Sequence, residues 1–496
     1  MADDGVTLRE INWREAFGFT NLFRGFRIAV HPSKLVLALI ALACLWCGGL
    51  VLDVVWPRSY QVTPQERSAL HATETGRALD SDIDARVRSY LRDLGARGEN
   101  TEAPDRERYG VFDTFFDYEV GRANSVLMAP TALLRGAVFE SIWEFIAVGP
   151  VWLWTHHWVF ALIYTAWFLL IWSVFGGAIS RIAAVHVARD EKISVRQALM
   201  FSVGKVLSFV FAPVIPVLIV LGIGVTIALA STVLLHIPWA GPILAGLFFF
   251  LALLGGFIIT LVILGTIGGF NLMYPTVAVE GSDSFDAISR SFSYVFARPW
   301  RMLWYTIVAV VYGAICYLFV RFFVYLVLAT TWFFMSWFLG AQHAPPADKS
   351  PADVWPRIWS QPVDPLASLR WGPDYDHLKG TEAVAAGLIV WWTYLIIGLI
   401  GAYAISFYFS ANTIIYYLMR REVDATEMGD VYVQETEDEL EEATAAGAPP
   451  AGGATVVSET TVRVYETPET TPPPAADSAP PAGEGPPPPP AEPRPA

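Results

Sequence analysis

The sequence predicts an all-α polytopic membrane protein, a six-helix transmembrane bundle made of three parallel repeats. Three observations predict this class: six long apolar runs, a helix-start phrase that occurs three times, and Lys and Arg residues gathered in alternate short loops. Hydrophobic residues make up 54% of the 496 residues and charged residues 16%, unlike an ordinary soluble domain. A helical extracytoplasmic insertion and a disordered C-terminal tail complete the predicted architecture.

Each apolar run is long enough to cross a bilayer, since about 20 helical residues span roughly 30 Å of hydrocarbon. The first run follows a cytoplasmic amphipathic segment, residues 1–34. It leads into Asp53 and Trp56 rather than a small-residue cleavage site, so we predict a retained span and no signal peptide. The predicted spans are residues 35–56, 151–178, 206–235, 241–270, 302–340 and 383–419.

The fifth run is nearly twice as long as one crossing requires. As a single helix, residues 302–340 would measure about 58 Å, and their one charge is Arg321. We expect the first half to cross, Arg321 to lie at the outer headgroup level as a structural residue, and the second half to tilt or lie in the interface. The alternative is two spans divided at Arg321.

The loop charges predict the topology, because short loops rich in Lys and Arg stay on the cytoplasmic side. Basic residues precede the first span, connect spans two and three and spans four and five, and follow span six. We therefore predict a multi-pass protein of the bacterial cytoplasmic (inner) membrane with both termini inside. The net charge of −14 arises in residues 422–496, which hold 16 acidic residues and 2 arginines.

The helix-start phrase defines the repeat. A capping residue is followed three positions later by Glu, Gln or Asp, then by Ala and a large hydrophobe, in residues 12–17, 194–199 and 283–288. Aromatic-rich segments ending in Ala follow, each with a proline within three residues: Pro32, Pro213 and Pro299. Each unit is then an interfacial elbow helix, an outward span and an inward span, and the units are parallel.

Small residues near the inner end of each inward span are candidate packing positions, because they let helix backbones approach closely in lipid. The candidates are Gly176, Gly177, Gly268, Gly269 and the pair Ser410 and Ala411.

The elbow helices are amphipathic, with arginines among their polar positions. In the third unit Arg290 and Arg298 are candidate interface residues in the headgroup layer, and anionic lipids at the elbows are candidate partners beside the bilayer itself.

Two further segments belong to the predicted chain. An insertion interrupts the bundle after the first span, and a tail follows the rest of the bundle, residues 138–424. The insertion, residues 57–137, shows helical stripes at 82–94 and 110–128. The tail, residues 425–496, is acidic and rich in Pro and is the candidate docking segment for a protein partner. We expect that deleting residues 430–496 would leave stability unchanged.

Chemistry-bearing patterns are scarce. Cys44 and Cys47 form a C-x-x-C inside a span, where packing explains them better than redox or metal chemistry. His156 and His157 point about 100° apart on a helix, and the loop containing Asp374 and His377 is a weak metal candidate. We predict no catalytic residue, no metal and no cofactor, and the absence of a basic excess argues against nucleic acid.

The stretch 274–283, running into the third elbow and Arg298, Pro299 and Trp300, resembles uncharacterised six-span bacterial membrane proteins. It is more distantly similar to the membrane domain that precedes the catalytic barrel in some glycerophosphodiester phosphodiesterases. The resemblance covers roughly residues 12–424 and implies a fold but no activity, because no catalytic domain follows the bundle here.

These observations favour a non-catalytic integral membrane protein that organises the envelope or binds partners or lipids. A transporter or lipid-handling permease using the three-repeat bundle is the alternative, supported by the repeats and opposed by the lack of ionisable residues at the span centres. A membrane enzyme is the third and least favoured class.

Overall fold

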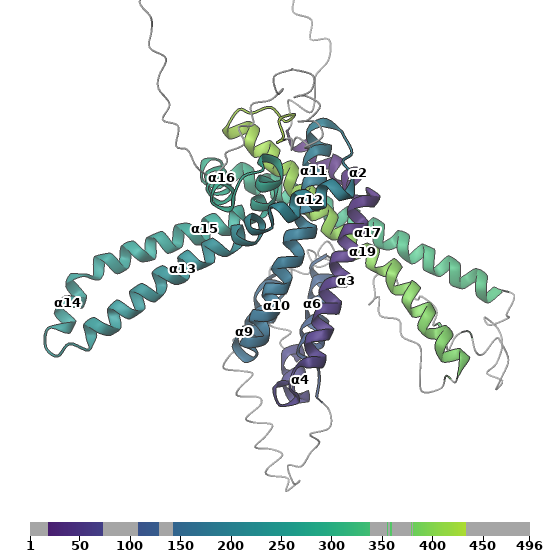
Figure 1. Ribbon diagram of the computed structural model, residues 1–496, viewed down its shortest axis with the longest axis horizontal. Coiled ribbons are helices and arrows are strands. Elements are labelled where there is room, and N and C mark those ends of the chain that lie inside the picture. The colour runs from purple at the N-terminus through teal and green to yellow at the C-terminus, as the bar shows by residue number, and fades with distance from the viewer. Residues whose placement is uncertain are drawn as a thin grey trace, which may run out of the picture. The chain divides into compact units, whose positions relative to one another are not determined.

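The computed structural model describes residues 18–72, 108–127, 142–337 and 380–432, together with 355, 358, 359 and 378. Apart from an isolated antiparallel bridge between Val62 and Tyr109, these residues form helices and their connections (Figure 1). The predicted all-α class is confirmed. The first copy of the helix-start phrase, the stripe at 82–94, the loop at 374–377 and residues 433–496 lie outside the described residues.

Within the described residues, six helices are long and apolar enough to cross a membrane, as predicted. The second begins at Trp158 rather than near residue 151, because His157 departs from helical backbone angles (φ −131°) and separates it from α9, Gly149–His156. The fourth begins at Phe249, after the short helix α14, Gly241–Leu247. The six are α3 (Pro32–Val55), α10 with α11 (Trp158–Arg189), α13 (Val206–Leu235), α15 (Phe249–Glu280), α17 (Pro299–Trp337) and α19 (Thr381–Val423).

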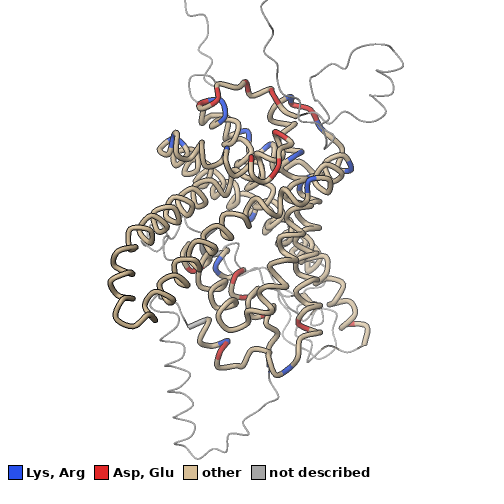
Figure 2. The backbone as a smooth tube through the Cα atoms, turned by 60° about the vertical axis from the view of Figure 1, so that its left-hand side comes forward, with Lys and Arg blue, Asp and Glu red and all other residues tan. Residues whose placement is uncertain are grey.

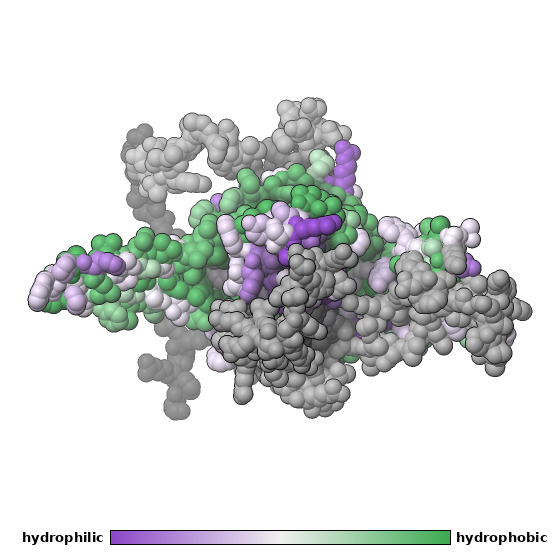
Figure 3. Space-filling view, turned by 90° about the horizontal axis from the view of Figure 1, so that it is seen from below, coloured by the Kyte–Doolittle hydropathy of each residue, from purple (hydrophilic) through white to green (hydrophobic). Residues whose placement is uncertain are grey.

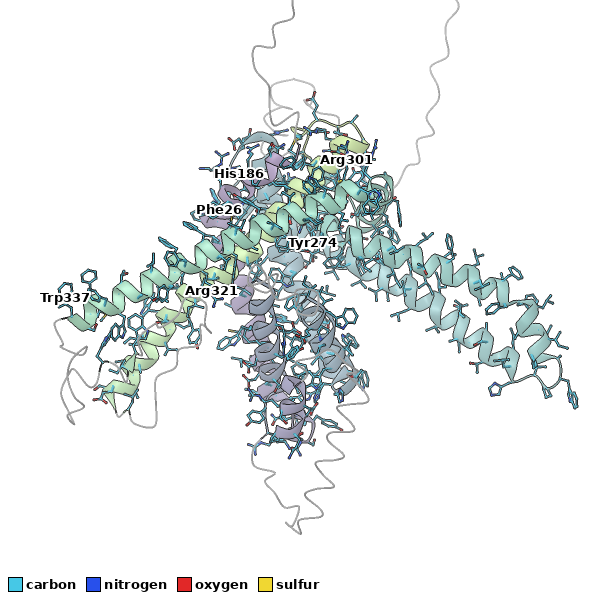
Figure 4. All side chains as sticks on the ribbon, turned by 180° about the vertical axis from the view of Figure 1, so that it is seen from behind. Phe26, His186, Tyr274, Arg301, Arg321 and Trp337 are labelled. Atoms are coloured by element: carbon cyan, nitrogen blue, oxygen red, sulfur yellow. The ribbon has the colours of Figure 1, made fainter. Side chains whose placement is uncertain are left out.

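The long fifth run forms one helix. α17 has 39 residues and continues through Arg321 without a break, so the division into two spans at Arg321 is wrong. In Figure 4, Arg301 and Trp337 mark its two ends and Arg321 lies between them. Arg321 is 22 residues beyond Pro299, about 33 Å along the helix axis.

The carboxyl ends of α11, α15 and α19 form a common core. α11 (Gly177–Arg189) contacts the last turns of α15 and of α19, and α15 also contacts α19. Every residue from 177 to 187 and from 409 to 420 is buried. We call this core and the elbow helices on it the hub.

Each elbow helix packs on the second membrane helix of the preceding unit. α12 (Val195–Gly204) lies on α11, and α16 (Ser284–Ala297) lies on α15. The first elbow, η1 (Gly18–Arg24) and α2 (Gly25–Ala29), lies on α19, which comes last in the chain. The packing therefore closes a cycle with all three elbows at one end, which agrees with parallel repeats.

The helix starts agree with the repeat, but part of its alignment is wrong. Ser194 and Gln197 make a capping box at α12, and Asp283 caps α16. Residues 209–212, aligned with the ends of the first and third elbows, instead lie inside α13, as does Pro213. The second elbow ends earlier, at Gly204, because Lys205 leaves the helical angles (φ −113°, ψ 17°).

A second core lies at the far end from the hub. α6 (Val111–Leu127), within the predicted stripe at 110–128, packs on α3 and α9, and α4 (Pro64–Ala72) packs on α6. Asp53 accepts hydrogen bonds from the N–H groups of Phe112 and Asp113 at 2.8 and 2.9 Å, which fixes the start of α6 on the end of α3.

Apolar side chains face outward along the hairpin formed by α13 and α15. Leu218, Val225, Phe250 and Phe257 are all more than half exposed, and Figure 3 shows hydrophobic residues covering this hairpin. Lipid is the medium that such a surface suits.

Candidate functional site

Polar side chains of the hub join helices from different repeats, beginning with Glu280. This last residue of α15 accepts a hydrogen bond from the Tyr416 hydroxyl at 2.6 Å. It also pairs with Arg290 at 3.1 Å and with Arg420 at 3.0 Å. One carboxylate therefore connects α15, α16 and α19. Its side chain is 11% exposed, so its charge is held by these partners rather than by water.

The two elbow arginines predicted to face the headgroups differ in their surroundings. Arg290 pairs with Glu280 and, within α16, with Asp286 at 3.1 Å. Burial acts to lower the pKa of Arg290, but the charge of Glu280 and the hydrogen bond and charge of Asp286 raise it above its ordinary value. Arg298 is exposed at the end of α16. Arg290 thus already has protein carboxylates as partners.

Residues 424–432, which we call the C-terminal strap, fold back onto the hub. Arg420 donates to the Asp430 carbonyl at 2.8 Å and to its carboxylate at 2.9 Å. The Tyr432 N–H donates to the Val279 carbonyl at 2.8 Å, and Val431 is 5% exposed. The predicted tail therefore starts too early, because residues 425–432 belong to the compact unit that ends at Tyr432.

Arg181 fixes the strap from the other side. Its guanidinium, on α11, donates to the Ala278 carbonyl at 2.8 Å and to the Tyr432 carbonyl at 2.6 Å. It also lies 4.5 Å from the centre of the Phe201 ring, a cation–π distance. Arg181 thus joins the first repeat, the second repeat and the strap.

Lys34 is the most deeply buried cation described in the hub. It lies in the first turn of α3 with 0% exposure, and its Nζ donates to Ser410 Oγ on α19 at 3.3 Å. The rings of His31 and His186 lie edge to face nearby, with centroids 6.1 Å apart. A buried ammonium that donates to a hydroxyl is costly, because the hydroxyl carries no compensating charge.

Sequence reasoning counted Lys34 as a loop charge and missed its position. Pro32 was the available signal, because proline favours the first helical turn and so places Lys34 inside the helix. The burial of Arg181 against Ala278 and the pairing of Glu280 with Arg420 had no such signal, since these partners lie 97 and 140 positions apart in the chain.

The two adjacent histidines at the far end do diverge. His157 Nε2 lies 3.2 Å from Glu66 Oε1, which also accepts from Trp152 Nε1 at 3.1 Å. His156 Nδ1 lies 2.8 Å from Thr155 Oγ1. Burial acts to raise the pKa of Glu66, but the hydrogen bond and charge of His157, the charge of His156 and the hydrogen bond from Trp152 hold that pKa below its ordinary value. This group connects α4 to α9 and to the start of α10.

The four candidate glycines lie at close helix contacts. A Cβ atom would come within 2.2 Å of Ser202 Oγ at Gly177 and within 2.6 Å of the Phe409 ring at Gly176. It would come within 2.7 Å of Val295 at Gly268 and 3.2 Å of Ser291 at Gly269.

Arg321 is 1% exposed and lies on the buried stripe of α17. Its depth in a bilayer stays a prediction.

No group of His, Cys, Asp and Glu within the described ranges could hold a metal ion. Comparison of the chain with protein-family models, curated proteins and solved structures gave no match.

Proposed function

We propose that this chain is a non-catalytic integral membrane protein that organises the envelope by holding a partner through its C-terminal tail. The observation that supports this most is the C-terminal strap. Arg181 and Arg420 bind the strap to the hub at Tyr432 and Asp430, so a segment recruited by the tail would be held at a fixed point on the membrane bundle.

The polar chemistry of the hub supports binding rather than catalysis. Arg290 and Arg420 both pair with Glu280, and each has a second carboxylate partner, Asp286 or Asp430. Arg181 is used on backbone carbonyls. Groups that saturate each other in this way stabilise helix contacts and leave little for a reacting substrate.

We propose that the hub faces the cytoplasm of a bacterial inner membrane. Most of the Lys and Arg residues drawn in Figure 2 gather at the hub end, where positive-inside topology would put them. The resemblance to six-span bacterial membrane proteins belongs to this proposal, because the stretch that carries it forms the end of α15 and the third elbow.

Single cysteines test the orientation. In a background with Cys44, Cys47 and Cys316 replaced by Ala, cysteines at 100, 238 and 360 should react with an impermeant thiol reagent on intact cells. A cysteine at 440 should react only after lysis. Labelling at 440 on intact cells would contradict the proposal.

Truncation tests the function. Full-length protein and a variant ending at Tyr432 should insert equally, and only the full-length protein should co-purify a protein partner. A lipid or solute held tightly by both proteins, with a protein partner in neither, would overturn the proposal and favour transport.

Transport is the second candidate, and the burial of Lys34 on a candidate span favours it. Intramembrane ionisable groups often belong to ion pathways. In proteoliposomes with an imposed potential, proton flux reported by a trapped pH dye would support transport if Lys34→Met abolished it. The proposed binding role predicts no flux in either protein.

A further inference from the structure

Four aromatic side chains from the three repeats meet where the membrane helices separate from the hub. The centroid of the Phe409 ring lies 5.7 Å from that of Trp172 and 5.8 Å from that of Tyr274. It lies 5.2 Å from the ring of the preceding residue, Tyr408. Trp172 belongs to the segment that joins α10 to α11, Tyr274 to α15 and Tyr408 to α19, so the second membrane helix of every repeat contributes a ring. Figure 4 shows Tyr274 at this fork.

Unused polar groups lie beside these rings. The Tyr408 hydroxyl donates to Asn271 Oδ1 at 2.7 Å, so the Asn271 side chain still has the two N–H donors of its Nδ2 atom. Neither these donors nor the hydroxyl of Tyr274, three residues further along α15, has a hydrogen-bond partner within the described part of the chain. Both groups are accessible, because neither polar atom is fully enclosed.

The cluster lies beside the predicted spans and away from the ionic groups of the hub. Tyr408 falls within the predicted span 383–419. Asn271 is nine residues before Glu280, about 14 Å along the axis of α15. Among the described residues, Asn271, Tyr274 and Tyr408 make no ion pair and no hydrogen bond to a charged group. Unused polar groups at such a position are candidates for holding a ligand.

We propose that this cluster binds the ring of a quinone, with the Asn271 amide and the Tyr274 hydroxyl donating to one of its carbonyl oxygens. Two unused donors require an acceptor, and the lack of charged partners for these side chains favours an uncharged acceptor. The aromatic walls suit a flat ring, which can stack on them or meet them edge to face. The binding of a quinone goes beyond the scaffold role, because it requires no partner of the tail.

The apolar tail of a quinone would find a matching surface on α15. Ile267, Leu264 and Phe257 precede Asn271 by 4, 7 and 14 residues, which places them on the same face of the helix. Their exposed fractions are 73, 53 and 60%. This stripe leads from the polar cluster away from the hub, so a molecule dissolved in the bilayer could reach the site from the side.

The test uses the full-length protein in a nonionic detergent. Decylubiquinone, decylbenzene and dioleoylglycerol are titrated separately, and binding is measured by native mass spectrometry and by the unfolding temperature. The first variant is Tyr274→Phe, which removes only the unused hydroxyl and should leave the unfolding temperature of the free protein unchanged. The second variant combines Tyr274→Phe with Asn271→Leu. Tyr394→Phe is the matched control, because Tyr394 is 44% exposed elsewhere on α19.

We expect decylubiquinone to bind the wild type and Tyr394→Phe alike and to bind Tyr274→Phe about three- to tenfold more weakly, because one hydrogen bond is lost. The double variant should bind more weakly still. Decylbenzene has the same tail and no carbonyl oxygen, so it should bind weakly and equally to all four proteins.

Equal binding of decylubiquinone to the wild type and Tyr274→Phe would overturn the proposal, as would decylbenzene that binds as tightly as decylubiquinone. Dioleoylglycerol that binds as tightly and is weakened as much by Tyr274→Phe would overturn the quinone as the ligand class. These titrations involve no partner of the tail, so a negative result leaves the scaffold role standing.

Discussion

The hydroxyl of Tyr294 donates to the carboxylate of Asp424 at 2.5 Å. The bond connects the third elbow to the residue that follows α19, across 130 positions of sequence. Burial, then the hydrogen bond and charge of Asp424, raise the pKa of Tyr294 above its ordinary value, so the phenol stays protonated and remains the donor. This bond holds the start of the C-terminal strap on the hub.

Removing the Tyr294 hydroxyl should therefore destabilise the hub. A hydrogen bond to a charged acceptor contributes about 1.5–3 kcal/mol, so Tyr294→Phe should lower the free energy of unfolding by roughly that amount. Thermal unfolding in detergent measures the effect. Tyr60→Phe is the control, because Tyr60 is 67% exposed at the far end. An unchanged midpoint for Tyr294→Phe would contradict the assigned role.

Two truncated chains that differ by four residues of the C-terminal strap should differ in unfolding temperature. A chain ending at Tyr432 keeps the bonds of Asp430 and Tyr432 to Arg420, Arg181 and Val279, whereas a chain ending at Met428 loses them. We expect an unchanged unfolding temperature for the first and a clear decrease for the second. Deletion of residues 430–496 also removes Asp430 and Tyr432, so it should lower the unfolding temperature, contrary to the expectation from the sequence. Equal stability of the two truncated proteins would show that the strap is dispensable.

Gly177 offers a direct test of the contact between α11 and α12. A Cβ atom there would meet Ser202 Oγ at 2.2 Å and Phe209 at 2.8 Å, so Gly177→Ala should cost about 1–3 kcal/mol through overpacking. Gly204→Ala is the matched control on α12, since its Cβ would meet nothing within 4 Å. The control should be neutral or gain up to about 1 kcal/mol from helix propensity. A neutral Gly177→Ala would mean that the helices can move apart freely.

Glu119 should make the far-end core sensitive to pH. Burial raises its pKa from 4.5 to about 8, against the opposing charge of Arg122. Its Oε1 is buried next to Gly149 and has no hydrogen-bond partner among the residues that the structure describes. Between pH 4.5 and 8 the folded protein therefore keeps a proton that the unfolded chain has released. The free energy of unfolding should decrease as pH rises through this window.

Glu119→Gln should remove that decrease. The variant should be more stable than the wild type near pH 8.5, by about 1–3 kcal/mol for a relieved buried polar group, and should differ little near pH 5. Thermal unfolding across pH measures this. Glu427→Gln, at an exposed position, should follow the wild-type profile. Parallel profiles for Glu119→Gln and wild type would rule out Glu119 as the titrating group.

The sequence by itself determined which of the described helices are long and apolar enough to cross a membrane, and the starts of two elbows. Hydrocarbon thickness sets a minimum length for an apolar helix, and capping residues mark helix ends locally, so α3, α17 and the caps Ser194 and Asp283 could be read directly. The continuity of α17 through Arg321 also follows from local sequence, because no turn residue interrupts it.

Only the tertiary structure decided which helices meet. An apolar side chain looks the same in sequence whether it faces lipid or another helix, so the packing of α2 on α19 could not be predicted. The pairing of Glu280 with Arg420 and the burial of Lys34 against Ser410 join residues 140 and 376 positions apart. Their electrostatic energy depends on distance and burial in the folded hub, and neither quantity is written in local sequence.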